Sequence, residues 1–336
     1  MTNVLAATSG PGNRAGGGGA VLISESIYAV LPGADLVPEF GLDRAQVFER
    51  LRTALTDFRD LGGATIVDMG GLTTGRDAEL LALLSDVTGV EIVATTGFGP
   101  AYTVGSHFTN NVSADGMTVD RIADIFRREL TEGLLIPTRE RLAATAGLVS
   151  VTQTAAGDPA LPFTRGQARI EADTARASAR AARAAGATVA VRVTEDPRGV
   201  LALLAEEGLP AARTLVLGLD RADHAAAGLP QALAAEGYTV GLDHVGWPTG
   251  AGYLAAEDRV RLVLDLIAAG HGDRVVVSSS AIGVAVELDA PVVADFGAVL
   301  RDFVPAFRAA GGTDAQLETL LVTTPRRLLT RTTPEA

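Results

Sequence analysis

Short apolar runs alternate along the chain with longer segments in which apolar residues recur every three or four positions. Eight of the short runs are rich in Val, Ile, Leu and Thr and are almost continuously hydrophobic. Strands that are buried on both faces of a parallel sheet have this composition. The predicted strands cover residues 19–23, 64–68, 90–95, 147–152, 188–193, 214–218, 238–242 and 274–279.

The longer segments have the spacing of amphipathic helices. In residues 44–61, Val47, Leu51, Leu55 and Phe58 fall on one side of a helix and are predicted to be buried. The other predicted helices cover residues 76–85, 119–132, 165–185, 198–207, 229–236, 259–269 and 293–310. Because about eight strand–helix units follow one another, the pattern predicts an α/β fold, a single-domain (β/α)8 TIM barrel. An open doubly wound sheet is the structural alternative.

The barrel is predicted to span residues 19–330, between a flexible N-terminal segment, residues 1–18, and a short C-terminal tail, residues 331–336. A Gly-rich run at residues 16–19 precedes the first strand, whereas a phosphate-binding turn follows a strand and opens a helix. We therefore interpret this run as an entry loop. Residues 97–117 follow the third strand as a long irregular segment and are a candidate lid or substrate loop.

Composition and charge exclude several classes of protein. Hydrophobic residues make up 47% and charged residues 20% of the 336 positions, which is enough for a large core. The formal net charge of −12 argues against a nucleic-acid-binding face. The N-terminal region has no basic segment followed by a long apolar run, and no apolar stretch reaches the ~18 residues of a membrane span. We expect a cytoplasmic protein, with neither nucleic acid nor membrane as a partner.

Two residue types are missing, and their absence limits the chemistry. The chain has no Cys, which excludes disulfides, thiolate nucleophiles and Cys metal ligands. All 28 residues counted as Lys or Arg are Arg, which excludes Schiff-base catalysis and a Lys general base. The chain contains four His: His107, His224, His244 and His271. Acid/base chemistry by imidazole near neutral pH therefore depends on few side chains.

Residues 64–98, ATIVDMGGLTTGRDAELLALLSDVTGVEIVATTGF, closely resemble the second and third strand regions of the phosphotriesterase-like branch of the amidohydrolase superfamily. Residues 162–191 are similar to the helix before its fifth strand, and residues 236–245, EGYTVGLDHV, to its seventh strand. Residues 274–329 are similar to its eighth strand and closing helix. The resemblance covers nearly the whole chain in the expected order. It implies a (β/α)8 barrel, and it implies a possible homodimer because the family often dimerises.

The resemblance also implies a metal centre, but this sequence departs from the family's ligand pattern. Family members hold two divalent metal ions with a His-x-His pair on the first strand, a carboxylated Lys on the fourth, single His residues on the fifth and sixth, and an Asp on the eighth. The matching positions here are Ser24, Ser26, Ser150, Arg192 and Ser280, with Leu219 or Asp220 on the sixth strand. Because hydroxyls bind such ions poorly and a guanidinium repels them, we predict no metal site and no cofactor.

Arg192 is the first candidate catalytic residue. A guanidinium at the end of a buried strand needs an anionic partner. The partner is either an anionic group of the substrate, held in a bidentate manner, or an internal carboxylate such as Glu25, Asp68 or Asp220. Strand alternation points Glu25 away from the two serines that flank it, so we interpret Glu25 as a structural hydrogen-bond acceptor.

Asp243 and His244 match an Asp-His pair on the family's seventh strand, where the His can help to move a proton away from metal-bound water. An imidazole is the usual acid/base group near neutral pH. The pair is also consistent with a structural hydrogen-bonded element. The side chains predicted to line the substrate site are Ser24, Ser26, Ser150, Asp220, Ser280, Tyr102 and Trp247.

These residues predict a metal-independent enzyme that performs acid/base chemistry on a small anionic or carbonyl-bearing metabolite. The reaction is hydrolysis, elimination, isomerisation or cyclisation, since such steps need only proton transfer and positioning. Two alternatives stay open. One is a catalytically inactive barrel that binds a ligand or a protein partner. The other is a residual metal-assisted ester or lactone hydrolase that uses Asp220, Asp243 or His244.

Overall fold

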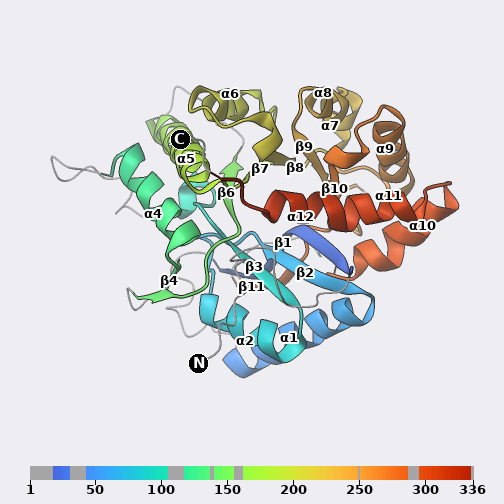
Figure 1. Ribbon diagram of the computed structural model, residues 1–336, viewed down its shortest axis with the longest axis horizontal. Helices are drawn as coiled ribbons and strands as arrows, with labels where there is room; N and C mark the ends of the chain where they lie inside the picture. The colour runs from blue at the N-terminus through green and yellow to red at the C-terminus, as the bar shows by residue number, and fades with distance from the viewer. Residues whose placement is uncertain are drawn as a thin grey trace.

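Nine parallel strands form the main sheet of the protein (Figure 1). The computed structural model describes residues 18–30, 43–104, 117–136, 140–154, 162–248, 250–286 and 295–333. In hydrogen-bonding order the strands are β10 (Val275–Val277), β9 (Thr239–Leu242), β8 (Thr214–Leu217), β7 (Val189–Val193), β6 (Leu148–Gln153), β3 (Glu91–Thr96), β2 (Gly63–Asp68), β1 (Ala20–Val30) and β11 (Ile282–Val286). All eight predicted strands are present, and β11 is an additional one.

Helices surround this sheet, as Figure 1 shows, and the protein is a single-domain TIM barrel. The main helices are α1 (Arg44–Asp60), α2 (Ala78–Thr88), α4 (Val119–Thr131), α5 (Pro162–Ala185), α6 (Arg198–Glu206), α7 (Ala222–Ala226), α8 (Leu229–Ala235), α9 (Ala256–Ala268), α10 (Val304–Ala309), α11 (Asp314–Glu318) and α12 (Thr324–Leu329). Short 3-10 turns are η3 (Ala101–Thr103), η4 (Ala211–Arg213) and η5 (Gly272–Arg274). A small antiparallel hairpin, β4 (Leu134–Leu135) and β5 (Arg141–Leu142), follows α4.

The last predicted helix is interrupted by a π-helical turn. The sequence pattern predicts one helix over residues 293–310, whereas the structure has the π-helix η6 (Val299–Phe303) and then α10. A second π-helix, η7 (Thr319–Thr323), precedes α12 in the same way. Both α10 and α12 have Pro near their first position. Pro lacks an N–H and crowds the carbonyl four residues earlier, so the turn before it widens.

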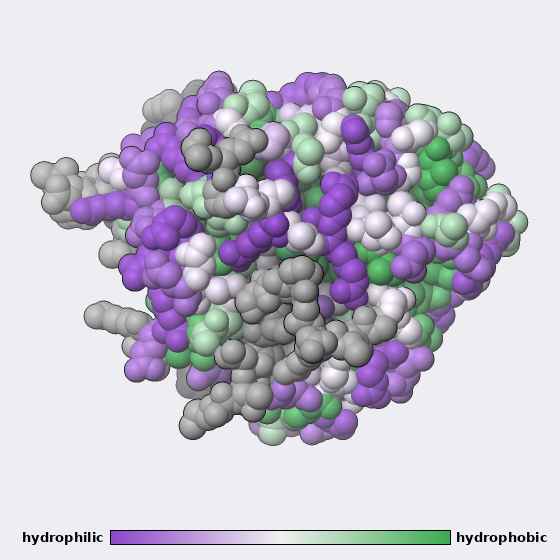
Figure 2. All heavy atoms as spheres, viewed as in Figure 1, coloured by the Kyte–Doolittle hydropathy of each residue, from purple (hydrophilic) through white to green (hydrophobic). Residues whose placement is uncertain are grey.

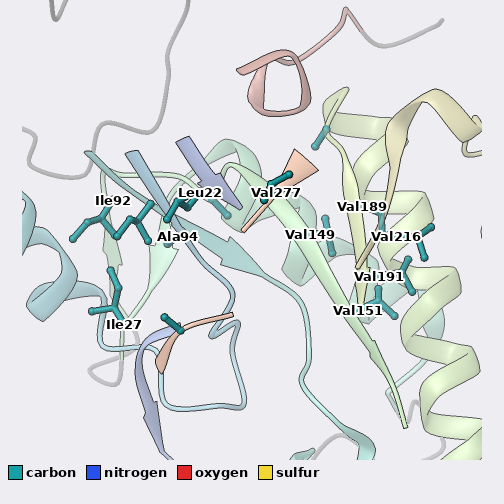
Figure 3. Packing of buried hydrophobic residues seen from close by; sticks show 14 of the residues in the cluster. Leu22, Ile27, Ile92, Ala94, Val149, Val151, Val189, Val191, Val216 and Val277 are labelled. Atoms are coloured by element: carbon teal, nitrogen blue, oxygen red, sulfur yellow. The ribbon is translucent and has the colours of Figure 1, made fainter. Parts of the chain in front are cut away.

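Apolar side chains on the two faces of the strands form two clusters. The larger one lies between the sheet and the helices, and Figure 3 shows part of it, including Leu22 and Ile27 of β1. The smaller one fills the barrel and includes Val21 and Ile23, because successive residues of a strand point to opposite faces. Leu328 and Leu329 of α12 belong to the smaller cluster. Thr188, just before β7, donates to the Leu328 carbonyl, so α12 covers the N-terminal ends of the strands.

The barrel closes between β1 and β10, which are in contact but are not neighbours in the hydrogen-bonded order of the described strands. The second half of β1 instead pairs with β11, from Ser26–Ile282 to Val30–Val286. We call the boundary between β1 and residues 275–281 the seam. Since α12 covers the N-terminal ends of the strands, their C-terminal ends, where TIM-barrel enzymes place their chemistry, are the expected location of a site.

Within the described ranges, none of the helices combines the length and the apolar composition that crossing a membrane requires. Figure 2 shows hydrophilic and hydrophobic residues mixed across the face in view.

Candidate functional site

The Asp243 carboxylate lies at the centre of a buried polar cluster. Its Oδ2 accepts hydrogen bonds from the Ser24 hydroxyl at 2.6 Å and the Ser280 hydroxyl at 2.8 Å. Its Oδ1 accepts the Gly218 N–H at 2.6 Å. The two serine oxygens are 3.0 Å apart. Ser24 lies within β1, where its pairing with β2 shifts, whereas Gly218 follows β8, Asp243 follows β9 and Ser280 follows β10. One irregular point of a strand and the ends of three others therefore build the cluster.

Both serines have a strained backbone. Ser24 has a φ of 151° and Ser280 a φ of 45°, and within the described part of the chain they are the non-glycine residues with positive φ. At Ser24 the pairing of β1 with β2 shifts between Ile23 and Glu25, which is the signature of a bulge. Such strain persists only where the surroundings hold it, and it concentrates at functional sites. The strain therefore marks this cluster as a candidate site.

Glu25 holds the seam next to this cluster. Its Oε1 accepts the Ser278 hydroxyl at 2.7 Å and the Ser279 N–H at 3.0 Å. Its Oε2 accepts the Ala281 N–H at 2.6 Å and the Ser279 hydroxyl at 3.0 Å. Burial raises the pKa of Glu25, and these hydrogen bonds only partly oppose the effect. Glu25 is thus the structural acceptor that strand alternation predicts.

Arg192 reaches the cluster from β7. Its Nη2 donates to the Ser24 hydroxyl at 3.0 Å and to the Ser24 carbonyl at 3.3 Å. Among the described residues Arg192 forms no ion pair, so none of Glu25, Asp68 and Asp220 is its ion-pair partner. Asp68, whose pKa the Arg192 charge helps to lower, accepts the Ile27 and Gly70 N–H groups instead. Burial raises the pKa of Asp68 to about 6, against the lowering effect of these N–H groups and of nearby guanidinium charge.

His244 is fixed by Asp220 on one side and by aromatic rings on the others. Its Nδ1 lies 2.8 Å from Asp220 Oδ1, and its backbone N–H donates to Asp220 Oδ2 at 2.9 Å. Arg259 Nε donates to the same Oδ2 at 2.7 Å. The His244 ring stacks on Tyr253 with centroids 3.6 Å apart and meets the edge of Trp247 at 4.9 Å. An imidazole oriented by a buried carboxylate is the geometry of a positioned acid/base group.

The charges around Asp220 keep it ionised. Burial favours the neutral acid, but His244 and Arg259 outweigh burial and hold the pKa of the Asp220 carboxyl below its usual range. His244 Nδ1 is also 3.7 Å from Asp243 Oδ1. A line of polar groups therefore runs from Arg259 through Asp220 and His244 to Asp243, and on to the two serines and Arg192.

Most of the predicted site residues meet in this arrangement, and three do not. Ser24, Asp220, Asp243, His244, Ser280, Arg192 and Trp247 lie in or against the line of polar groups. Ser26 donates its backbone N–H to Ala281 and pairs along β11. The Ser150 hydroxyl donates to the Thr96 carbonyl on the neighbouring strand. Tyr102 is 60% exposed in η3. On the sixth strand Asp220 faces His244, whereas Leu219 packs in the apolar core.

Two residues that the sequence analysis did not single out complete the site. Arg259 is buried in α9 and pairs with Asp220. It lies on the buried, apolar side of that helix together with Val263 and Leu266. A charged residue at a position where the helical spacing predicts an apolar one is the sequence feature that could have indicated it. Tyr253, which stacks on His244, lies in a loop where no sequence period indicates its position.

The residues present do not fit the binuclear metal centre that the resemblance implies. Asp220, Asp243 and His244 offer ligand atoms within 4.8 Å of one another. However, each oxygen of the two carboxylates already accepts at least one hydrogen bond. Arg259 contacts one carboxylate, and the Arg192 guanidinium lies against Ser24 at a family ligand position. Positive charge at these points disfavours a divalent cation.

The sequence matches the family model described as Phosphotriesterase family over residues 7–329. The chain belongs to the phosphotriesterase family. It is 27% identical over 326 residues to a phosphotriesterase homology protein of Mycobacterium tuberculosis, with 93% of this chain and 94% of that protein aligned. It is 26% identical over 299 residues to an N-acetyltaurine hydrolase of Danio rerio, with 85% and 78% aligned.

A solved structure has the same fold. The phosphotriesterase homology protein of Escherichia coli, described as complexed with phosphate in its active site, superposes with a TM-score of 0.74. The superposition covers 93% of this chain and 99% of that chain at 20% identity. This likeness confirms the (β/α)8 barrel prediction, and the family match confirms the resemblance on which part of that prediction rested.

Proposed function

We propose that this member of the phosphotriesterase family is a metal-independent enzyme that acts on a small anionic, carbonyl-bearing metabolite. Arg192 binds the anionic group, and His244, oriented by Asp220, together with Asp243 performs the acid/base chemistry. The observation that carries the proposal is Arg192 itself. Its half-buried guanidinium donates only to Ser24 among the described residues, although a charge in such a place needs an anion.

The acid/base part rests on the geometry of His244. Asp220 binds Nδ1, so the other ring nitrogen, Nε2, is the one that can exchange a proton with a substrate. Tyr253 and Trp247 hold the ring plane, which fixes the direction of that exchange. A positioned acid or base contributes about 10²–10⁴-fold to a rate.

The relatives support an oxyanion ligand. The Escherichia coli structure is described with phosphate in its active site. The Danio rerio relative is named for N-acetyltaurine, a molecule with an amide carbonyl and a sulfonate anion. A tetrahedral or planar oxyanion suits the several parallel donors of a guanidinium. Hydrolysis of an amide or ester that carries such a group is therefore the reaction class that we favour.

A residual metal-assisted hydrolase is the second candidate, because Asp220, Asp243 and His244 do bring three ligand-type groups together. The deciding measurement is the metal content per chain. We expect well below one equivalent in protein purified without added metal, and again after incubation with zinc, manganese or cobalt followed by dialysis. Stoichiometric metal that survives dialysis would overturn the proposal in favour of this candidate.

Anion binding can be followed through Trp247, the only Trp of the chain, which lies against His244. We expect a saturable change of its fluorescence on titration with sulfate or phosphate. Arg192→Gln should weaken binding about 10–100-fold, since a hydrogen bond to a charged group contributes about 1.5–3 kcal/mol. The matched control is Arg198→Gln, which removes an exposed arginine paired with Glu236. Equal affinity in Arg192→Gln and in the control would contradict the assignment of Arg192.

A further inference from the structure

The two strained serines meet at one carboxylate, and the mechanism above uses neither hydroxyl. Ser280 is in the left-handed region, in the segment that follows β10, at the edge where the site lies. A strained turn directly after a strand is how some hydrolase folds present a nucleophilic serine above a sheet. The sequence has no G-x-S-x-G motif around Ser280. The strain and the hydrogen bond to Asp243 are therefore visible only in the structure.

The surroundings distinguish the two hydroxyls. Ser24 is completely buried, and its oxygen already accepts a hydrogen bond from Arg192. Ser280 keeps 6% exposure, and its described polar contacts are Asp243 at 2.8 Å and the Ser24 oxygen at 3.0 Å. Of the two, Ser280 is the less buried, and a base is in direct contact with its hydroxyl.

We infer that Ser280 is a covalent nucleophile, activated by Asp243, in the hydrolysis of a small ester or amide whose anionic part binds near Arg192. This inference deepens the proposed function and rests on it. It replaces the metal-bound hydroxide of the family with a side-chain oxygen. The necessary parts are a nucleophile with a base at hydrogen-bonding distance and a cation near the reacting carbonyl.

The chemical step balances without a further reactant. The Ser280 oxygen attacks the carbonyl carbon while its proton moves to Asp243 Oδ2, and the carbonyl electron pair moves to oxygen. Besides holding the anionic part of the substrate, Arg192 is the cation nearest to that oxyanion among the groups of this cluster, because its Nη2 and the Ser280 oxygen both lie 3.0 Å from the same Ser24 oxygen. Collapse expels the alcohol or amine, which takes the proton from Asp243. Water then attacks the acyl group while its proton moves to Asp243, and the released Ser280 oxygen takes that proton back from Asp243.

The test uses an alkyl fluorophosphonate, a probe whose phosphorus reacts with an activated serine and loses fluoride. We expect one adduct per chain in the intact mass of the full-length protein. Trypsin cuts this Lys-free chain only after Arg, so Ser280 and Ser24 fall in the separate peptides 275–301 and 15–44. Fragment spectra of the first peptide then distinguish Ser280 from the neighbouring serines, which donate to Glu25.

Ser280→Gly is the informative variant, because glycine adopts a φ of 45° without strain and the backbone is kept. We expect its urea midpoint to equal or exceed that of the wild type, and its labelling to be lost. The matched control is Ser85→Ala, which removes a serine of α2 that donates to the Val90 carbonyl and should label like the wild type.

The outcomes separate this inference from the proposed function. An adduct on Ser24, or labelling that persists in Ser280→Gly, overturns the assignment of Ser280. No adduct on the folded wild type overturns covalent catalysis, but it leaves Arg192 and its anion titration untouched. A wild-type protein that is labelled at Ser280 but does not respond to sulfate or phosphate supports the nucleophile, but it overturns the anion site and with it the anionic class of substrate.

Discussion

Replacing Glu25 by Gln tests whether one carboxylate holds the seam between β1 and β10. Each carboxylate oxygen accepts one hydrogen bond from a serine hydroxyl and one from a backbone N–H. The backbone donors are Ser279 for Oε1 and Ala281 for Oε2. The Gln amide keeps one oxygen and turns the other into a donor. A hydroxyl can rotate to accept from the new NH2 group, but a backbone N–H cannot. One buried N–H therefore loses its acceptor whichever way the amide is turned.

The expected cost follows from that count. A buried donor without a partner costs about 1–3 kcal/mol, so Glu25→Gln should lower the free energy of unfolding by about that amount at pH 5. Burial raises the pKa of Glu25, so its stabilising contribution is complete below the usual carboxyl range and is lost as the pH rises through the folded-state pKa. Gln does not titrate. The difference between the two proteins should therefore be smaller at pH 8 than at pH 5.

The assay is urea unfolding followed by circular dichroism at the two pH values. The fluorescence of Trp247 reports the same region, because its Nε1 donates to the Ser279 carbonyl at 2.7 Å. The control is Glu49→Gln, which removes an exposed carboxylate that pairs with Arg52 in α1 and should leave the midpoint unchanged. A Glu25→Gln protein as stable as the wild type at pH 5 would refute the argument that this carboxylate holds the seam.

Three further predictions concern other buried charges. Burial raises the pKa of Asp68 to about 6, so its contribution to stability is complete below pH 3.8 and falls by about 3 kcal/mol as the pH rises through 6. Asp68→Asn should abolish this pH dependence of the unfolding free energy, measured by urea unfolding between pH 4 and 7. Glu129→Gln breaks the buried ion pair with Arg76, 2.6 Å long, and should cost about 3–5 kcal/mol in the same assay. Glu132→Gln, at the exposed C-cap of the same helix, should not move the midpoint. Arg259→Leu should raise the pKa of the Asp220 carboxyl, measured from its carbon-13 chemical shift, and an unchanged value would mean that His244 alone keeps it ionised.

The barrel could be predicted from the sequence because its strands are buried on both faces. Val189–Val193 and Thr214–Leu217 are almost purely apolar, and their hydrophobic runs end where the strands end. The exception is β11. Its pairing with the second half of β1 joins residues more than 250 positions apart, from Ser26 and Ile282 onward. No local period specifies that contact, so the extension of β1 to Val30 was not predicted.

The site was predictable as a set of positions but not as a geometry. Alternation places Ser24 and Ser26 on the same face of a strand. The bulge at Ser24 shifts the pairing of β1, and only Ser24 reaches Asp243. Backbone strain of this kind is imposed by tertiary contacts and leaves no mark in the residue pattern. The same holds for Tyr253, whose place against His244 depends on the path of a loop.

The candidate site lies across the place where the barrel closes. Ser24 belongs to β1, on one side of the seam, whereas Ser280 follows β10 on the other. A ligand that contacts both sides binds only while the seam is closed, so its binding free energy stabilises the closed barrel. Opening of the seam and release of the ligand are therefore linked equilibria. Amide hydrogens of residues 20–26 and 275–281 should then exchange more slowly with deuterium when a ligand is bound, while those of α6 on the far side keep their rates.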